Sequence, residues 1–302
     1  MPNWGELLVE INDANQGGVN PFDVVRRKYL TKVSEITGRN VIAYYSAFLT
    51  KSGSQDLAIN DSDKSGLMLT IHKLDKKKGL DLILHTPGGE VAATESIVDY
   101  LYSIFDKDIR VIVPQIAMSA GTMISLASKE ILMGNHSNLG PIDPQYNGVA
   151  CQAVVDEFEQ AVNDVTVNPQ SAMIWQPIFN KYHPTFLGTC KNAIAWSERM
   201  VLEWLQYNMC NGDDEKSKNI LNIFSDHKHQ KSHSRHISKK ECKSAGLNIM
   251  DLEDDQELQD AVLSTHHMYM HTFDNTSTLK IIENNLGIAL IKSQQLQHNT
   301  NP

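Results

Sequence analysis

Two short glycine-containing segments carry the residue types that acyl-transfer chemistry requires. Thr86-Pro-Gly-Gly89 follows the apolar run Leu82-Ile-Leu84, and Met118-Ser-Ala-Gly121 follows Ile109-Arg-Val-Ile-Val113. Consecutive glycines let a backbone approach a ligand closely. Ser119 stands just before an expected helix, where unpaired N–H groups and the helix dipole favour developing negative charge. We therefore interpret Ser119 as a candidate nucleophile for a carbonyl carbon.

The same two segments would supply an oxyanion hole. Its donors would be the N–H groups of Gly89 and Ala120, with Gly88 completing the first turn. Two such preorganised donors contribute about 3 kcal/mol each to a transition state. The alternative is that Gly88 and Gly89 only form a turn and Ser119 only caps a helix, because serine is common at helix starts. The residues by themselves leave both interpretations open.

Alternating strands and helices must bring these two turns together. In a mainly parallel sheet with right-handed crossovers, turns that follow strands lie at the carboxyl edge, where open α/β sheets place their sites. Residues 151–209 are expected to be helical, and 211–243 form a polar stretch rich in Lys and His. Further helices are expected at 66–74, after Gly89, at 122–129 and at 251–273. The expected strands are 41–48, 82–84, 109–113, 130–133, 280–283 and 288–292.

Composition excludes several classes of protein. The chain of 302 residues is 41% hydrophobic and 21% charged, which is ordinary for a globular protein and unlike a disordered or collagen-like one. A net charge of -9 gives no general attraction to nucleic acid or to an anionic membrane. The four cysteines form no CxxC pair, and no signal peptide or membrane-spanning run is visible. We expect a cytoplasmic protein with no nucleic-acid partner and no integral membrane segment.

Three motifs in order resemble the Clp/crotonase superfamily: His85-Thr-Pro-Gly-Gly-Glu90, Met118-Ser-Ala-Gly-Thr122 and Leu139-Gly-Pro-Ile-Asp-Pro-Gln145. Within it the chain resembles the SppA-like serine proteases, and most closely the SDH-type (serine dehydrogenase proteinase) Clp-fold family. Similar sequence at residues 38–45 and 236–247 extends the resemblance to roughly residues 25 to 290.

This resemblance implies an α/β, Clp/crotonase-like fold of repeated ββα units with additional helices. It implies a serine endopeptidase with Ser119 as nucleophile and an oxyanion hole around Gly88, Gly89 and Ala120. Peptides or unfolded proteins would be the substrates, and neither a cofactor nor a metal would be required. Relatives of this fold assemble into rings or stacks, so a homo-oligomer is expected.

The base is less clearly marked. A Ser–His–Asp site of the ClpP kind would need a histidine near 140–141, where this chain has Gly-Pro, and His136 lies a few residues earlier. SppA-like enzymes resemble one another in using a Ser–Lys dyad. A lysine base needs a pKa lowered by apolar burial. Lys191 and Lys181 lie in apolar helical sequence, and we favour Lys191, although either could be an ordinary surface lysine.

Two further groups of residues are weaker candidates. His227, His229, His233 and His236 lie among basic residues, so a zinc site, a nucleic-acid contact or a solvated loop would each explain them, and we favour the loop. Asp143 and Gln145 could orient the site, build a subunit contact, or only shape a turn between prolines.

We therefore expect a helical N-terminal extension (1–38), a Clp/crotonase-like peptidase domain (39–275), and a short C-terminal β addition with a polar tail (276–302). The predicted activity is peptide-bond cleavage through a Ser–Lys dyad and an acyl-enzyme. The alternatives are a crotonase-type acyl-CoA enzyme, which uses the same backbone donors without a serine nucleophile, and an inactive Clp-fold scaffold.

Overall fold

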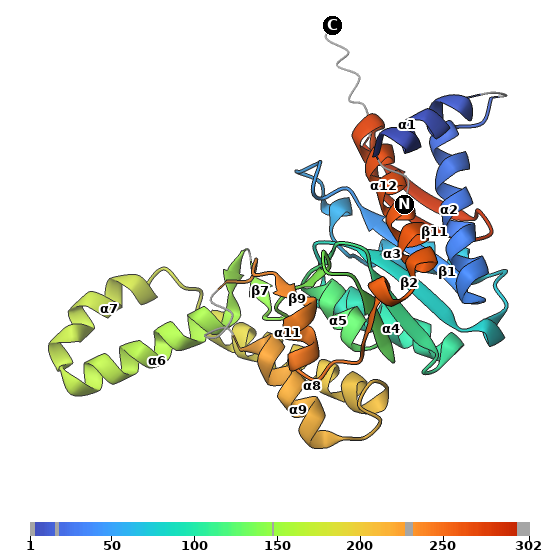
Figure 1. Ribbon diagram of the computed structural model, residues 1–302. Coiled ribbons are helices and arrows are strands. Elements are labelled where there is room, and N and C mark those ends of the chain that lie inside the picture. Colours follow the sequence, from blue (N-terminus) through green and yellow to red (C-terminus); the bar gives the residue numbers. More distant parts are fainter. Residues whose placement is uncertain (1–3, 16–17, 147, 227–231, 295–302) are drawn as a thin grey trace, which may run out of the picture.

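A seven-stranded, mostly parallel sheet forms the centre of the molecule (Figure 1). The computed structural model describes residues 4–15, 18–146, 148–226 and 232–294. The strand order is β10-β5-β3-β2-β1-β11-β12; all neighbours are parallel except that β11 is antiparallel to both β1 and β12. The strands are β1 (Asn40–Ser46), β2 (Leu80–His85), β3 (Ile109–Val113), β5 (Glu130–Met133), β10 (Ile249–Asp251), β11 (Thr278–Asn284) and β12 (Ala289–Ser293).

Helices cover both faces of this sheet, as its sequence requires. Successive side chains point to opposite faces, and on β1 both Val41 and Ile42 are fully buried, one on each side. One face packs against α2 (Pro21–Thr37) and α12 (Gln256–Asn275), on which α1 (Trp4–Asp13) rests. The other face packs against α3 (Ser62–Ile71), α4 (Val91–Phe105), α5 (Ala120–Leu126), α8 (Phe186–Tyr207) and α9 (Asp214–Ser225).

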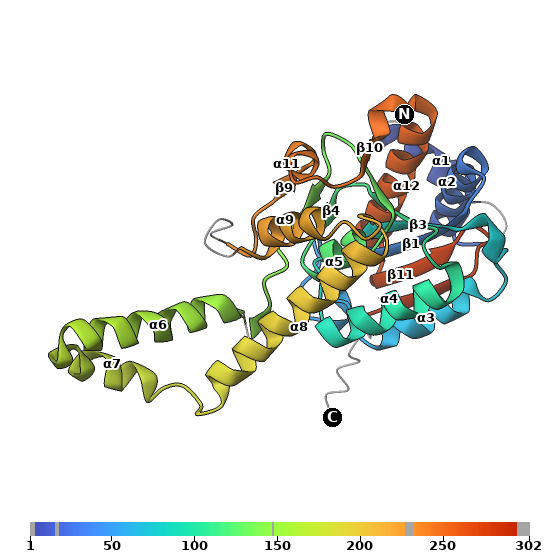
Figure 2. The same ribbon diagram turned by 90° about the horizontal axis from the view of Figure 1, so that it is seen from below.

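A helical arm projects away from this body (Figures 1 and 2). It consists of α6 (Cys151–Val167), α7 (Ala172–Phe179) and the first turns of α8. A small apolar cluster that includes Val155 and Cys190 packs α6 against α8, and the ring of Phe179 of α7 packs on that of Phe158 of α6. A two-stranded ribbon of β7 (Gln145–Tyr146) and β8 (Val149–Ala150) leads into the arm. Within the described residues, no helix is long and apolar enough to cross a membrane.

A second, three-stranded sheet lies beside the carboxyl edge of the main one. It has the order β4-β6-β9, with β4 (Ile116–Ala117) parallel to β6 (Asn138–Leu139) and β6 antiparallel to β9 (Ile237–Ser238), which leads into α11 (Lys239–Ser244). Because β9 is antiparallel to β6, the residues just before β9 lie at the same end of this small sheet as the residues just after β4 and β6.

The predicted α/β class is confirmed, and the expected strands of the central sheet are present within a few residues. The stretch expected to be polar over 211–243 also contains a helix that its sequence did not predict, since α9 occupies Asp214–Ser225. The Asp213 side chain accepts the Lys216 N–H and begins this helix, and Ile220 and Phe224 are fully buried on its inner face. The last two predicted strands, β11 and β12, extend the main sheet next to β1.

A buried ion pair joins the N-terminal helices to the sheet. Arg26 of α2 donates to the Glu283 carboxylate of β11 at 2.7 Å, and both side chains are fully buried. A buried charge that loses its partner is strongly unfavourable.

We therefore expect Arg26→Met to lower the free energy of unfolding by about 3 kcal/mol, because it removes the fully buried guanidinium and leaves the Glu283 carboxylate paired only with the partly exposed Arg27 and the Tyr269 hydroxyl. Urea denaturation followed by circular dichroism measures this. Arg199→Met is the control: Arg199 pairs with Glu203 at 4.0 Å on the surface of α8, so its loss should change stability by less than about 0.5 kcal/mol. Equal effects would contradict the account.

Candidate active site

Ser119 occupies a backbone conformation that non-glycine residues seldom adopt. Its φ is 51° and its ψ is -114°, and the Gly121 N–H donates to Met118 O at 2.7 Å across it. This is the first central position of a turn of type II′, where a positive φ is required. A strained residue of this kind persists only when its surroundings hold it, and such residues concentrate at functional sites. The turn presents the half-buried Ser119 side chain between β4 and α5.

The Gly88-Gly89 turn touches Ser119 closely because neither residue has a side chain. A Cβ on Gly88, whose φ is 96°, would lie 2.7 Å from Ser119 Cβ and 2.9 Å from Ala120 N. A Cβ on Gly89 would lie 2.2 Å from Ile59 O. Both glycines are therefore required by close approach: Gly88 to the serine turn, and Gly89 to the backbone of a third segment.

That third segment, residues 55–60, fixes the orientation of the Gly88–Gly89 peptide. The Ile59 N–H donates to Gly88 O at 2.7 Å, and the Glu90 N–H donates to Ile59 O at 2.9 Å. The Gly88 N–H donates to Thr86 Oγ1. Among the described residues, these bonds therefore use the N–H groups of Gly88 and Glu90 but not the N–H group of Gly89. With its carbonyl held by Ile59, the Gly88–Gly89 peptide leaves its N–H available to a ligand.

The small β4-β6-β9 sheet gathers three further segments at the serine. Leu139 pairs with Ala117 on one side and with Ile237 on the other. Ser119 comes two residues after β4, Asp143 four residues after β6, and His233 four residues before β9. The pairing therefore brings Asp143 and His233, 90 positions apart in the sequence, to the same edge as Ser119.

His233 and Asp143 form a hydrogen-bonded pair. His233 Nδ1 lies 2.7 Å from Asp143 Oδ1; the Asp143 side chain is 2% exposed, whereas that of His233 is 29% exposed. Gln145 Nε2 donates to the other carboxylate oxygen at 3.1 Å. A carboxylate only accepts, so the Nδ1 atom carries a proton, and in the neutral form of the imidazole the Nε2 atom is then an acceptor.

One cavity connects these groups. It has a volume of about 550 Å³ and is lined by Ser119, Ala120, both turn glycines, His233 and residues of the 55–60 segment. Its apolar wall is formed by Val91, Met123 and Ile142. His136 does not line this cavity, and burial lowers its pKa. Burial also lowers the pKa of His85, just before the Thr86–Gly89 turn, to about 3, so that imidazole stays neutral.

The structure places the two candidate lysines on the arm. Lys191, on α8, lines a different groove together with Val155 and Phe158 of α6, and Lys181 is exposed just after α7. Neither lines the cavity of Ser119. Ser119, Gly88, Gly89 and Ala120, by contrast, line one cavity, and their catalytic roles stay predictions.

The sequence favoured no single role for Asp143, which could orient the site, build a subunit contact or shape a turn, and it indicated His233 only as a member of the histidine group interpreted as a solvated loop. Their partnership depends on the pairing of β6 with β9, for which two-residue strands leave no periodic signal. The described residues contain no group of three or more His, Cys, Asp or Glu side chains that could hold a metal ion. His227 and His229, the first two members of the histidine group, lie outside the described residues.

The chain belongs to the ClpP-like, SDH-type serine proteinase family, which it matches over residues 23–281. It is 31% identical over 193 residues to an uncharacterized protein of Methanocaldococcus jannaschii, covering 64% of this chain and 60% of that protein. A second uncharacterized protein of the same organism is 30% identical over 167 residues, covering 54% of this chain and 49% of the relative. The chain thus spans one half to three fifths of these relatives.

At most positions glycine makes a folded protein less stable than alanine does, and the strained turn at Ser119 predicts the opposite order there. Because φ is positive at 119, Ser119→Gly should be more stable than Ser119→Ala by about 1 kcal/mol. At Ser125, which is buried within α5, Ser125→Gly should instead be less stable than Ser125→Ala by about 1 kcal/mol. Thermal and urea unfolding of the four variants measure both differences. The same sign at both positions would refute the strained geometry.

Proposed function

We propose that this protein is a serine peptidase in which Ser119 is the nucleophile and His233, oriented by Asp143, is its general base. The observation that carries the proposal is the shared cavity: a serine in a strained turn and an imidazole held by a buried carboxylate line the same space. Nucleophile, base and orienting carboxylate are the three roles of a catalytic triad, which is recognised by geometry and not by chain order. Membership of a serine proteinase family supports the same assignment.

In the proposed acylation step, His233 Nε2 accepts the Ser119 Oγ proton as the serine attacks the peptide carbonyl. The Asp143 carboxylate stabilises the imidazolium through its bond to Nδ1. The negative charge that develops on the substrate oxygen is stabilised by the N–H groups of Gly89 and Ala120. His233 then gives its proton to the leaving amine.

Water completes the reaction. His233 accepts a proton from a water molecule that attacks the acyl-enzyme, and Ser119 recovers its proton when the second product leaves. The apolar wall of Val91, Met123 and Ile142 favours a substrate with an apolar side chain beside the scissile bond.

A Ser–Lys dyad with Lys191 or Lys181 is the competing proposal. It would require either lysine of the arm to reach Ser119 from outside the cavity wall. His233 needs no such displacement, because it already lines the cavity. The predictions of a homo-oligomer, of peptide or unfolded-protein substrates and of a cytoplasmic location stay predictions.

Single substitutions separate the two bases. His233→Ala should lower peptide turnover about 10³-fold or more, and Asp143→Asn should also lower it strongly, because general-base catalysis and its orientation are lost. Lys191→Ala and Lys181→Ala should retain turnover within about twofold. Cleavage of a fluorogenic peptide library measures these rates, and His236→Ala, an exposed histidine three positions away, is the matched control.

Loss of turnover in Lys191→Ala or Lys181→Ala with an active His233→Ala would replace the triad by the dyad. A wild-type chain that cleaves no peptide but turns over an acyl-CoA would favour the crotonase-type alternative. A wild-type chain that acts on neither would favour the inactive scaffold.

A further inference from the structure

The 55–60 segment is held in place from the interior of the protein. Its backbone is tied at three points around Ile59: Ser46 Oγ donates to Leu57 O at 2.6 Å, Lys280 Nζ donates to Ala58 O at 2.7 Å, and the Asn60 N–H donates to Asp63 Oδ2 at 3.1 Å. Ile59 is the residue whose backbone bonds both Gly88 O and the Glu90 N–H.

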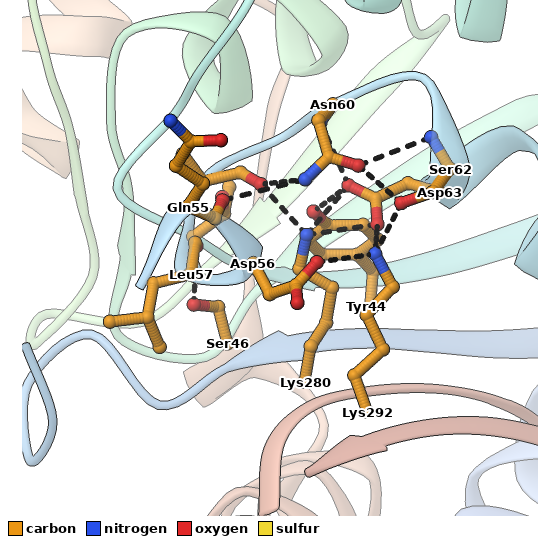
Figure 3. Close-up of polar contacts among 12 residues, drawn as sticks. Tyr44, Ser46, Gln55, Asp56, Leu57, Asn60, Ser62, Asp63, Lys280 and Lys292 are labelled. Atoms are coloured by element: carbon orange, nitrogen blue, oxygen red, sulfur yellow. Dashed lines mark hydrogen bonds and ion pairs between the residues drawn. The ribbon is translucent and has the colours of Figure 1, made fainter. Parts of the chain in front are cut away.

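Lys280 is the centre of this arrangement (Figure 3). Its ammonium lies 2.9 and 2.7 Å from the two carboxylate oxygens of Asp63, in addition to its bond to Ala58 O. Tyr44 also donates to Asp63, at 2.7 Å. Lys280 is 1% exposed and Asp63 is fully buried. Lys280 projects from β11 toward α3, on the face that carries Ile282.

Burying this ion pair is unfavourable unless something is gained from it. Desolvation disfavours both charges, and burial lowers the pKa of Lys280 although the Asp63 carboxylate acts against it. A pair of apolar residues would fill the same volume without that cost. What the ammonium adds is a charge-assisted bond to one backbone oxygen, that of Ala58, adjacent to Ile59.

We propose that Lys280 is a positioning residue for the oxyanion hole, acting through Ala58 and Ile59 on the Gly88–Gly89 peptide. The inference rests on the proposed function, which gives the Gly89 N–H its role. Lys280 itself does not line the cavity. Its contribution is to hold Ile59 so that the Gly88 carbonyl stays turned away and the Gly89 N–H stays turned toward the substrate oxygen.

The test removes the bond to Ala58 without leaving a buried charge. In the double variant Lys280→Met/Asp63→Asn the charges disappear together, and Asn at 63 still offers an oxygen to Tyr44 and to the Asn60 N–H. Arg26→Met/Glu283→Gln is the matched control. It removes another fully buried ion pair from the same strand, β11, on the opposite face of the sheet.

We expect the Lys280 double variant to lower kcat about 10- to 100-fold with KM within about twofold, because a donor misplaced by about 1 Å stabilises the transition state less. Hydrogen exchange at the amides of Ile59 and Glu90 should become faster. The Arg26 double variant, measured at a temperature where both are folded, should keep the kcat and the exchange of these two amides near the wild-type values.

A kcat equal to that of wild type, or unchanged exchange at Ile59 and Glu90, would overturn the positioning role. An equal loss of kcat in the control would show that any buried pair on β11 has the same effect and would also overturn it. A wild-type chain that neither cleaves peptides nor reacts with a fluorophosphonate would overturn the proposed function instead, while the exchange measurement still decides whether Lys280 holds Ile59.

Discussion

The candidate site depends on a close approach of three backbones that leaves no room for a Cβ atom. The Gly88 backbone touches the serine turn, and the Gly89 backbone touches Ile59. Neither contact could form with alanine in place of glycine unless the surrounding backbone moved. This contact brings the serine and the candidate oxyanion donors into one cavity. It also keeps Ser119 in a conformation that a free chain would leave.

The rest of the fold supports this contact from two directions. On one side, β11 and α3 supply the buried Lys280–Asp63 pair that ties down the 55–60 segment. On the other, the short β4-β6-β9 sheet sets the edge from which Ser119, Asp143 and His233 extend. Helices on both faces bury the main sheet, whose carboxyl edge carries these segments. The candidate donors and the serine lie in turns that closely follow strands, while the candidate base comes from a loop beside them.

Much of the fold could be predicted because its signals are local. The apolar strand at 109–113 and the turn at Thr86–Gly89 each carry their own pattern, and so does the short segment around Ser119, the candidate nucleophile. Helix α9 was missed because charged and polar residues dominate its sequence, and its inner face is narrow. The His233–Asp143 pair was missed for another reason: two-residue strands join segments about 90 positions apart, and nothing in either segment indicates the other. The expected lysine base came from the resemblance to SppA-like enzymes and stays a prediction, while the structure places His233, and neither Lys191 nor Lys181, at the cavity.

The central claim is that Ser119 is the nucleophile. Treatment with a fluorophosphonate, followed by peptide mass spectrometry, locates the residue that attacks an electrophilic centre. The account predicts one adduct per chain, on the peptide that contains Ser119. An active peptidase whose adduct lies on another residue, or which forms no adduct at all, would contradict it.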